Sequence, residues 1–120
     1  MENVSEFMKR RSDCPITCTL DLIGDKWTLV VLRDLLFFNK TKFDEFLESP
    51  EKISTSVLTD RLHRLERAGL IEKSQYSTHR LRMSYLPTEK GRALEPVLNE
   101  IVRWGQRNIE NTNVFQSPDT

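Results

Sequence analysis

The side chains of this 120-residue chain that are best suited to chemistry lie close together in the sequence. They offer hydroxyl, imidazole and guanidinium groups, and they are Ser54, Thr55, Ser56, Thr59, His63, Arg64 and Arg67. Groups of these kinds donate hydrogen bonds to phosphate oxygens and to the edges of bases. They can act together only if the backbone brings them onto one exposed face.

Residues 54–68 are predicted to form an amphipathic helix with both ends marked. Ser54 can cap the first turn with its hydroxyl, and Gly69 suits the left-handed conformation that often follows a last turn. Three leucines recur at helical spacing and would share one buried stripe, namely Leu58, Leu62 and Leu65. The polar side chains then lie outward. A merely solvated helix has the same pattern, so this helix alone leaves both interpretations open.

Asp60 is an exception on the predicted outer face, because a carboxylate repels phosphate. It is tolerated there if it pairs with Arg64 or accepts a hydrogen bond from a cytosine. The residue types leave both alternatives open.

Charge is separated along the chain although the formal net charge is zero. Residues 61–92 hold eight Lys or Arg against three Asp or Glu, which gives +5, whereas residues 1–60 and 93–120 sum to −3 and −2. The positive segment includes most of the predicted helix and the residues that follow it. Such clustering is what a nucleic-acid binding surface requires.

Other classes of protein find little support in the sequence. Arg33 and Asp34 interrupt the longest apolar run, so no segment is expected to span a bilayer, and the N-terminus lacks the pattern of a signal peptide. We therefore expect a cytoplasmic protein without membrane contact. There is no glycine-rich phosphate loop, no paired catalytic carboxylates and no Cys/His metal spacing, so we expect no enzyme activity, metal or cofactor.

Three shorter helices are predicted ahead of this one, at residues 17–24, 26–38 and 42–48. Asp25 can cap the second, which is apolar on nearly all sides and should be the most buried, with Arg33 and Asp34 marking its exposed edge. The third is joined to the polar-faced helix by a short link containing Pro50. This is the helix-turn-helix arrangement, although the turn is slightly long for the strict motif.

Two strands are predicted after Gly69, at residues 70–76 and 81–86, because apolar and polar residues alternate there. A hairpin at this place is the wing of a winged helix-turn-helix. Its basic tip, residues 76–82, would lie on the DNA backbone or in the minor groove. The candidate contacts in the wing are His79, Arg80 and Arg82.

A last helix is predicted from residue 88 to about residue 111, broken into two pieces or kinked at Pro96. Its apolar face beyond Pro96 requires a partner, which is either a second subunit or the chain's own core. The fold class is therefore mainly α with a small β-hairpin. We predict one winged helix-turn-helix domain over residues 1–112 with dimerising terminal helices, and a disordered tail over residues 113–120.

Several short motifs carry a resemblance to a known family. They are Cys14-Pro15, Leu22-Ile23-Gly24-Asp25-Lys26-Trp27, Gly69-Leu70-Ile71, Thr88-Glu89-Lys90-Gly91 and Trp104-Gly105. On these residues the chain resembles the HxlR family of bacterial winged-helix transcriptional regulators, which are relatives of the MarR type. The resemblance covers about residues 14–107.

The resemblance implies a homodimer that binds double-stranded DNA at a two-fold symmetric operator, more often as a repressor than as an activator. The recognition helix is then residues 54–68 in the major groove, and the two half-sites lie about one helical turn, roughly 34 Å, apart. Arg82 matches a family arginine in the wing. Many family members have a Pro-Pro pair before that arginine, whereas this chain has Arg80-Leu81, so its wing departs from the family pattern.

Some family members sense oxidants or electrophiles through a cysteine at the position of Cys14. The resemblance therefore implies a candidate redox sensor and a small-molecule or oxidant effector. Sensing requires a thiolate of lowered pKa, which a helix N-terminus or the nearby Arg10 and Arg11 would favour. The alternative is that Cys14 is a buried residue kept for packing.

A competing hypothesis is a winged helix that binds a protein instead of DNA. A protein-binding face is more often apolar, and the cluster of basic residues on the predicted face disfavours it. Those residues are Arg64, Arg67, Arg80 and Arg82.

Overall fold

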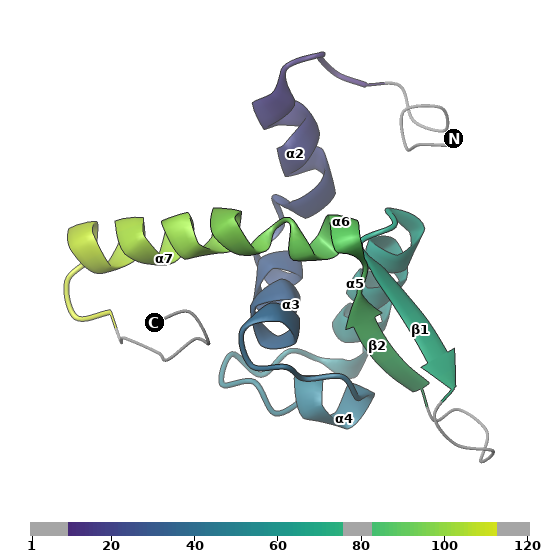
Figure 1. Cartoon of the computed structure of the whole chain (residues 1–120). Helices are drawn as coiled ribbons and strands as arrows, with labels where there is room; N and C mark the ends of the chain where they lie inside the picture. The colour runs from purple at the N-terminus through teal and green to yellow at the C-terminus, as the bar shows by residue number, and fades with distance from the viewer. Residues whose placement is uncertain (1–9, 76–82, 113–120) are drawn as a thin grey trace.

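A computed structural model of the chain describes residues 10–75 and 83–112, and it has the predicted fold class, mainly helical with a small antiparallel hairpin (Figure 1). The elements in order are α2 (Pro15–Ile23), α3 (Lys26–Leu36), α4 (Phe43–Phe46), α5 (Thr55–Arg67), β1 (Ile71–Gln75), β2 (Met83–Pro87), α6 (Glu89–Arg92) and α7 (Glu95–Asn108). The predicted wing tip and tail, residues 76–82 and 113–120, lie outside the described residues. No helix within the described ranges is long and apolar enough to cross a membrane.

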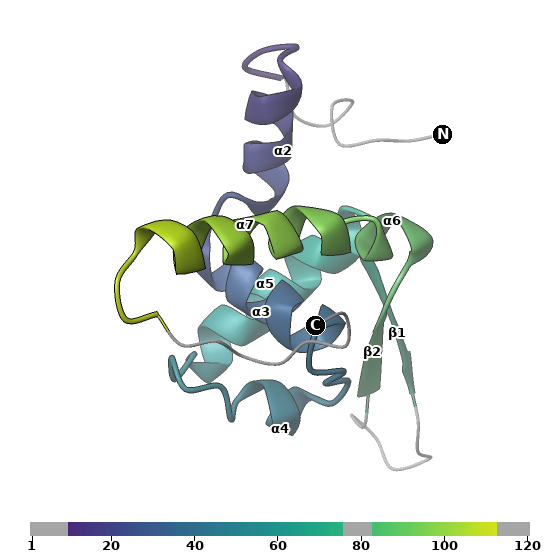
Figure 2. The same cartoon turned by 60° about the vertical axis from the view of Figure 1, so that its left-hand side comes forward.

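Helix α3 lies in the core and has the largest set of buried side chains among the described helices, as predicted. They are Thr28, Val31, Leu32, Asp34, Leu35 and Leu36. Asp25 caps its first turn by accepting a hydrogen bond of 3.0 Å from the Thr28 backbone N–H. Helix α5 packs on α3 through the predicted leucine stripe, whose three members are at most 4% exposed. Helix α7 lies above α3 in both views (Figures 1 and 2) and contributes Leu98 to the core.

The prediction that Asp34 marks the exposed edge of α3 is wrong. Its side chain is 2% exposed and accepts hydrogen bonds of 3.0 and 2.8 Å from Arg33, with the Lys40 ammonium 3.6 Å away. Arg33 also holds Glu51 through two bonds of 2.7 and 3.0 Å. A buried carboxylate is stable only with such partners. This ionic group ties the end of α3 to the link before α5, where Lys52 has a φ of +62°.

The hairpin strands pair antiparallel in one register: Ile71 with Pro87, Glu72 with Leu86, Lys73 with Tyr85, Ser74 with Ser84, and Gln75 with Met83. The described strands lie close to the predicted ranges. The segment before α4 extends this sheet, because the Tyr85 N–H donates to the Thr41 carbonyl at 2.7 Å and Lys42 bridges Ser84. A bridge this short has no sequence period, so the residue pattern does not predict it.

The predicted last helix is divided into two pieces, which is one of the two alternatives predicted for Pro96; the other was a kink. The break falls between α6 and α7, and Pro96 lies in the first turn of α7 because that turn tolerates a missing N–H. Thr88 caps α6 through a 3.1 Å bond from the Gly91 N–H, and its hydroxyl donates to the Gly69 carbonyl at 2.7 Å. Helix α6 therefore abuts the end of α5.

Gly91 leaves no room for a side chain at this contact. A Cβ built on Gly91 would lie 2.1 Å from the Leu70 carbonyl oxygen, which is a backbone atom that cannot swing away. We predict that Gly91→Ala lowers the free energy of unfolding by about 2 kcal/mol, within the range of overpacking substitutions. Urea unfolding followed by circular dichroism measures this free energy.

Gly105→Ala is the matched control, because nothing lies within 4 Å of a Cβ at this position in α7. Alanine is the better helix former, so this substitution should be neutral or stabilise by up to about 1 kcal/mol. Equal destabilisation by both substitutions would contradict the steric account of Gly91.

Candidate nucleic-acid interface

The outer face of α5 carries the predicted contact residues. All seven that precede the wing are exposed: Ser54, Thr55, Ser56, Thr59, His63, Arg64 and Arg67. The structure therefore brings them together on one surface, opposite the leucines that pack on α3. The three wing candidates, His79, Arg80 and Arg82, lie outside the described residues.

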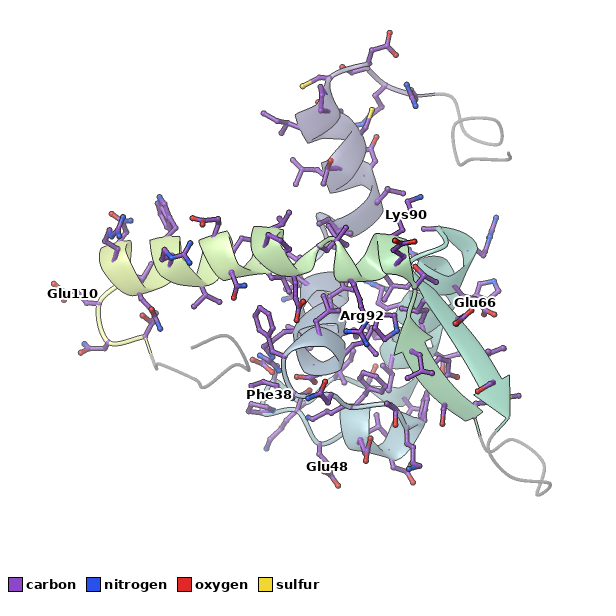
Figure 3. All side chains as sticks on the ribbon, viewed as in Figure 1. Phe38, Glu48, Glu66, Lys90, Arg92 and Glu110 are labelled. Carbon is purple, nitrogen blue, oxygen red and sulfur yellow. The ribbon has the colours of Figure 1, made fainter. Side chains whose placement is uncertain are left out.

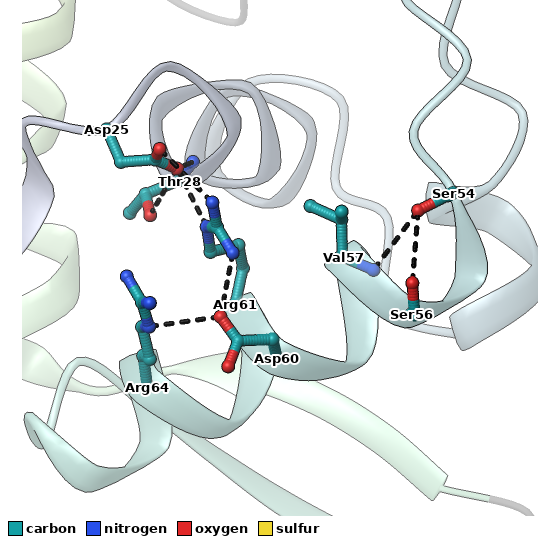
Figure 4. Close-up of polar contacts among 8 residues, drawn as sticks. All are labelled: Asp25, Thr28, Ser54, Ser56, Val57, Asp60, Arg61 and Arg64. Atoms are coloured by element: carbon teal, nitrogen blue, oxygen red, sulfur yellow. Dashed lines mark hydrogen bonds and ion pairs between the residues drawn. The ribbon is translucent and has the colours of Figure 1, made fainter.

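The first turn of α5 is organised by Ser54, as predicted. Its hydroxyl accepts a 3.2 Å bond from the Val57 N–H and lies 3.5 Å from the Ser56 hydroxyl (Figure 4). The last turn ends before Gly69, whose φ of +77° is the predicted left-handed conformation. Both ends of the helix are thus held by groups that the sequence marks.

Asp60 pairs with Arg64, which is one of the two alternatives that the sequence left open. Its Oδ2 lies 3.0 Å from Arg64 Nε and also accepts a 2.7 Å bond from Arg61 Nη1. The carboxylate on the outer face is therefore matched by two guanidiniums.

Arg61 links α5 to the cap of α3, and sequence reasoning missed this contact. Its Nε and Nη2 donate to the two carboxylate oxygens of Asp25 at 2.7 and 3.2 Å. The hydrogen bond from Arg61 holds the pKa of the Asp25 carboxyl well below its ordinary value. The available signal was position, because Arg61 directly precedes Leu62 and so borders the buried stripe.

The usable positive surface is smaller than the sequence suggests. The Arg61 side chain is 16% exposed and its guanidinium contacts Asp25, and the Lys73 ammonium lies 3.8 Å from Glu66. Lys90 donates to the Ala68 carbonyl at 3.2 Å, at the junction of α6 with the end of α5 (Figure 3). On the outer face of α5, Arg64 and Arg67 remain exposed.

Cys14 is exposed and occupies the N-cap position of α2, so the alternative that it is a buried packing residue is wrong. The backbone N–H groups of Thr17 and Ile16, in the first turn of α2, lower the pKa of its thiol. The N-terminus of α2 therefore lowers the thiol pKa, which is one of the two causes that the sequence suggested; the other was the nearby Arg10 and Arg11. Arg11 instead pairs with Asp21 at 2.5 Å, and Arg10 pairs with Asp13 at 3.6 Å.

A second surface is apolar and lies on α2 and α7. Its exposed members are Ile16, Leu20, Val97, Ile101, Trp104 and Ile109. On α7 the spacing from Val97 to Ile101 and Trp104 is four and then three residues, so these side chains share one face. Trp104 is 62% exposed, which is high for a tryptophan.

Comparison with known proteins agrees with this architecture. Residues 22–113 match the family described as HxlR-like helix-turn-helix. The HTH-type transcriptional regulator YdeP of Bacillus subtilis is 39% identical over 94 residues, which are 78% of this chain and 73% of YdeP.

Solved structures agree as well. The redox regulator HypR in its reduced form superposes with a TM-score of 0.71 at 33% identity, over 81% of this chain and 95% of that one. A MarR-family transcriptional regulator from Porphyromonas gingivalis gives a TM-score of 0.73 at 28% identity, over 82% of this chain and 95% of that one. The family and its relatives are transcriptional regulators and not enzymes, and this chain belongs to the HxlR-like helix-turn-helix family.

Proposed function

We propose that the chain is a homodimeric transcriptional repressor that binds a two-fold symmetric operator through α5 in the major groove. The observation that carries the proposal is the exposed polar face of α5, rich in hydrogen-bond donors, on a helix whose other face is fixed in the core. A regulator of this kind acts where the chromosome lies, so we assign it to the cytoplasm.

The residues of α5 divide into two groups by their place on the helix. Ser54, Thr55 and Ser56 lie at its N-terminus, where unpaired backbone N–H groups favour a phosphate. Farther along, Thr59, His63 and Arg64 carry groups that read base edges, and Arg67 has the charge for a phosphate contact. The wing residues His79, Arg80 and Arg82 are proposed to contact the backbone or the minor groove.

The apolar surface on α2 and α7 supports the dimer. Monomeric proteins rarely expose so many large apolar side chains on adjacent elements, and a two-fold pair would cover the same surface on both copies. The described terminal helices then hold two α5 helices in a fixed relation. Bacterial operators with two half-sites require such a relation.

Cys14 is proposed as a redox-sensitive residue. Its exposure and lowered pKa favour the thiolate, and HypR, which is similar in structure, is a redox regulator. With hydrogen peroxide, the thiolate attacks one oxygen, the S–O bond forms as the O–O bond breaks, and hydroxide leaves. Sulfur loses two electrons and becomes a sulfenic acid. The new group at the start of α2, beside the dimer surface, would weaken DNA binding.

We predict that Arg67→Ala and Arg82→Ala each weaken binding to an operator duplex selected by the wild-type protein from a randomised pool. Each dimer would lose two phosphate contacts, so the slope of log K against log [salt] should flatten by about two. Fluorescence anisotropy at several salt concentrations measures it. Arg107→Ala, in the last turn of α7, is the control and should leave the slope unchanged. Unaltered slopes for both test variants would contradict the assigned interface.

We predict that Ile101→Asp separates the dimer, because it buries a charge in each half of the apolar surface. The dimer dissociation constant should rise at least about 100-fold, since two isoleucine contacts worth about 2 kcal/mol each are lost. Sedimentation equilibrium measures the constant. Gln106→Asp adds the same charge on another face of α7 and should leave the dimer intact. A stable dimer of the Ile101→Asp protein would overturn the proposed surface.

We predict that Cys14 reacts with iodoacetamide faster than Cys18 at pH 7, because its lowered pKa leaves more thiolate. The rate should reach half of its maximum at a lower pH than the ordinary pKa of a cysteine thiol. Cys14→Ser should bind the operator normally and keep it under peroxide, whereas Cys18→Ser should release it like the wild type. Full release of the operator by the Cys14→Ser protein would exclude this cysteine as the sensor.

A further inference from the structure

A chain of charged groups runs from the cap of α3 to the outer face of α5 (Figure 4). We propose that Asp60 is a positioning residue that holds Arg64 for the recognition of guanine, which makes Arg64 a specificity-determining residue. The inference rests on the proposed function, in which α5 enters the major groove. Beyond that function, it names guanine as the base that is read and the Asp60–Arg64 pair as the groups that select it.

The contacts form an unbroken sequence from the core outward. The Thr28 N–H donates to Asp25, and both oxygens of Asp25 accept from Arg61. Arg61 donates its Nη1 to Asp60 at 2.7 Å, and the same Asp60 oxygen lies 3.0 Å from Arg64 Nε. Arg64 is therefore held by a carboxylate that is itself held at a fixed distance from α3.

Along this series of contacts, the solvent exposure of the side chains rises toward the outer face of α5. The side chain of Arg61 is 16% exposed, that of Asp60 is 47% exposed and that of Arg64 is 61% exposed. An isolated pair between Asp60 and Arg64 at the surface would order the arginine only weakly. The half-buried Arg61 supplies the anchor that such a surface pair lacks.

The geometry suits guanine in particular. A guanidinium binds the O6 and N7 acceptors of guanine with two parallel N–H groups. The contact with Asp60 uses Nε, and a bidentate base contact needs only the two terminal nitrogens of Arg64. Orienting the guanidinium in advance reduces the entropy lost when the base is bound.

Asp60 has an opposite effect on sequence-independent binding, and this difference makes the proposal testable. Its negative charge lies on a face that approaches phosphates, so it must weaken binding to any duplex. A positioning role strengthens binding only to a duplex with guanine in the right place. Asp60 therefore increases the ratio of specific to non-specific affinity.

The test compares the wild type with Asp60→Asn on two duplexes, the selected operator and a scrambled sequence of equal length. We expect the Asp60→Asn protein to bind the scrambled duplex at least as tightly as the wild type, while the ratio of the two affinities falls about tenfold, within the range of one bidentate base contact. Glu72→Gln removes the same charge from the exposed side of β1 and should leave the ratio unchanged.

A double-mutant cycle with Arg64→Lys shows whether Asp60 acts through Arg64. Lysine keeps the charge but lacks both the planar fork of parallel N–H groups and the Nε that Asp60 holds. Arg64→Lys should therefore weaken discrimination at a G·C pair, tested by replacing each pair in turn. In that background Asp60→Asn should change the ratio less than about twofold. The Asp60→Glu protein keeps a carboxylate at this position. An affinity ratio close to that of the wild type for this protein would further support positioning.

Three outcomes would overturn this inference alone. They are an unchanged ratio for Asp60→Asn, an equal loss of the ratio with and without Arg64, and no G·C pair whose discrimination depends on Arg64. Failure of the wild type to select any sequence from the pool is a different result, and it would overturn the proposed function.

Discussion

The packing of α5 on α3 is the constraint on which the rest of the structure depends. Three leucines bury one face of α5, and each contributes about 1.5–3 kcal/mol when fully buried. A helix held in this way has no freedom to rotate, so the residue types between the leucines decide what the outer face presents. The hydroxyls, His63 and the exposed arginines of α5 are outward for this reason.

Ionic and polar contacts then fix the position of α5 more finely. Asp25 and Arg61 join its flank to the cap of α3, and Arg33 and Glu51 hold the link that precedes it. At its far end, Thr88 and Gly91 place α6 against the residues that follow its last turn. Surface ion pairs contribute little to stability, so their value here lies in orientation.

Features with a short period or a local signal could be predicted from the sequence. The leucine stripe, the Ser54 and Asp25 caps, the left-handed Gly69 and the break just before Pro96 each depend on neighbours within about one turn. The division of the chain into a helix-turn-helix and a hairpin follows from these signals. The exposed face of α5 was predictable as soon as its buried stripe was known.

Contacts between distant residues could not be predicted in the same way. Charge alone places Asp34 outside, but Arg33 and Lys40 make its burial tolerable, and no periodic pattern encodes such partners. The same is true of Arg61 with Asp25, which are 36 residues apart in the sequence.

The most direct test of the central claim is a titration of the isotope-labelled protein with the selected operator, followed by backbone amide chemical shifts. If the outer face of α5 reads DNA, the largest changes should fall on residues 54–67, with smaller changes on α3. Changes concentrated on α2 and α7, with the amides of α5 unaffected, would contradict the account.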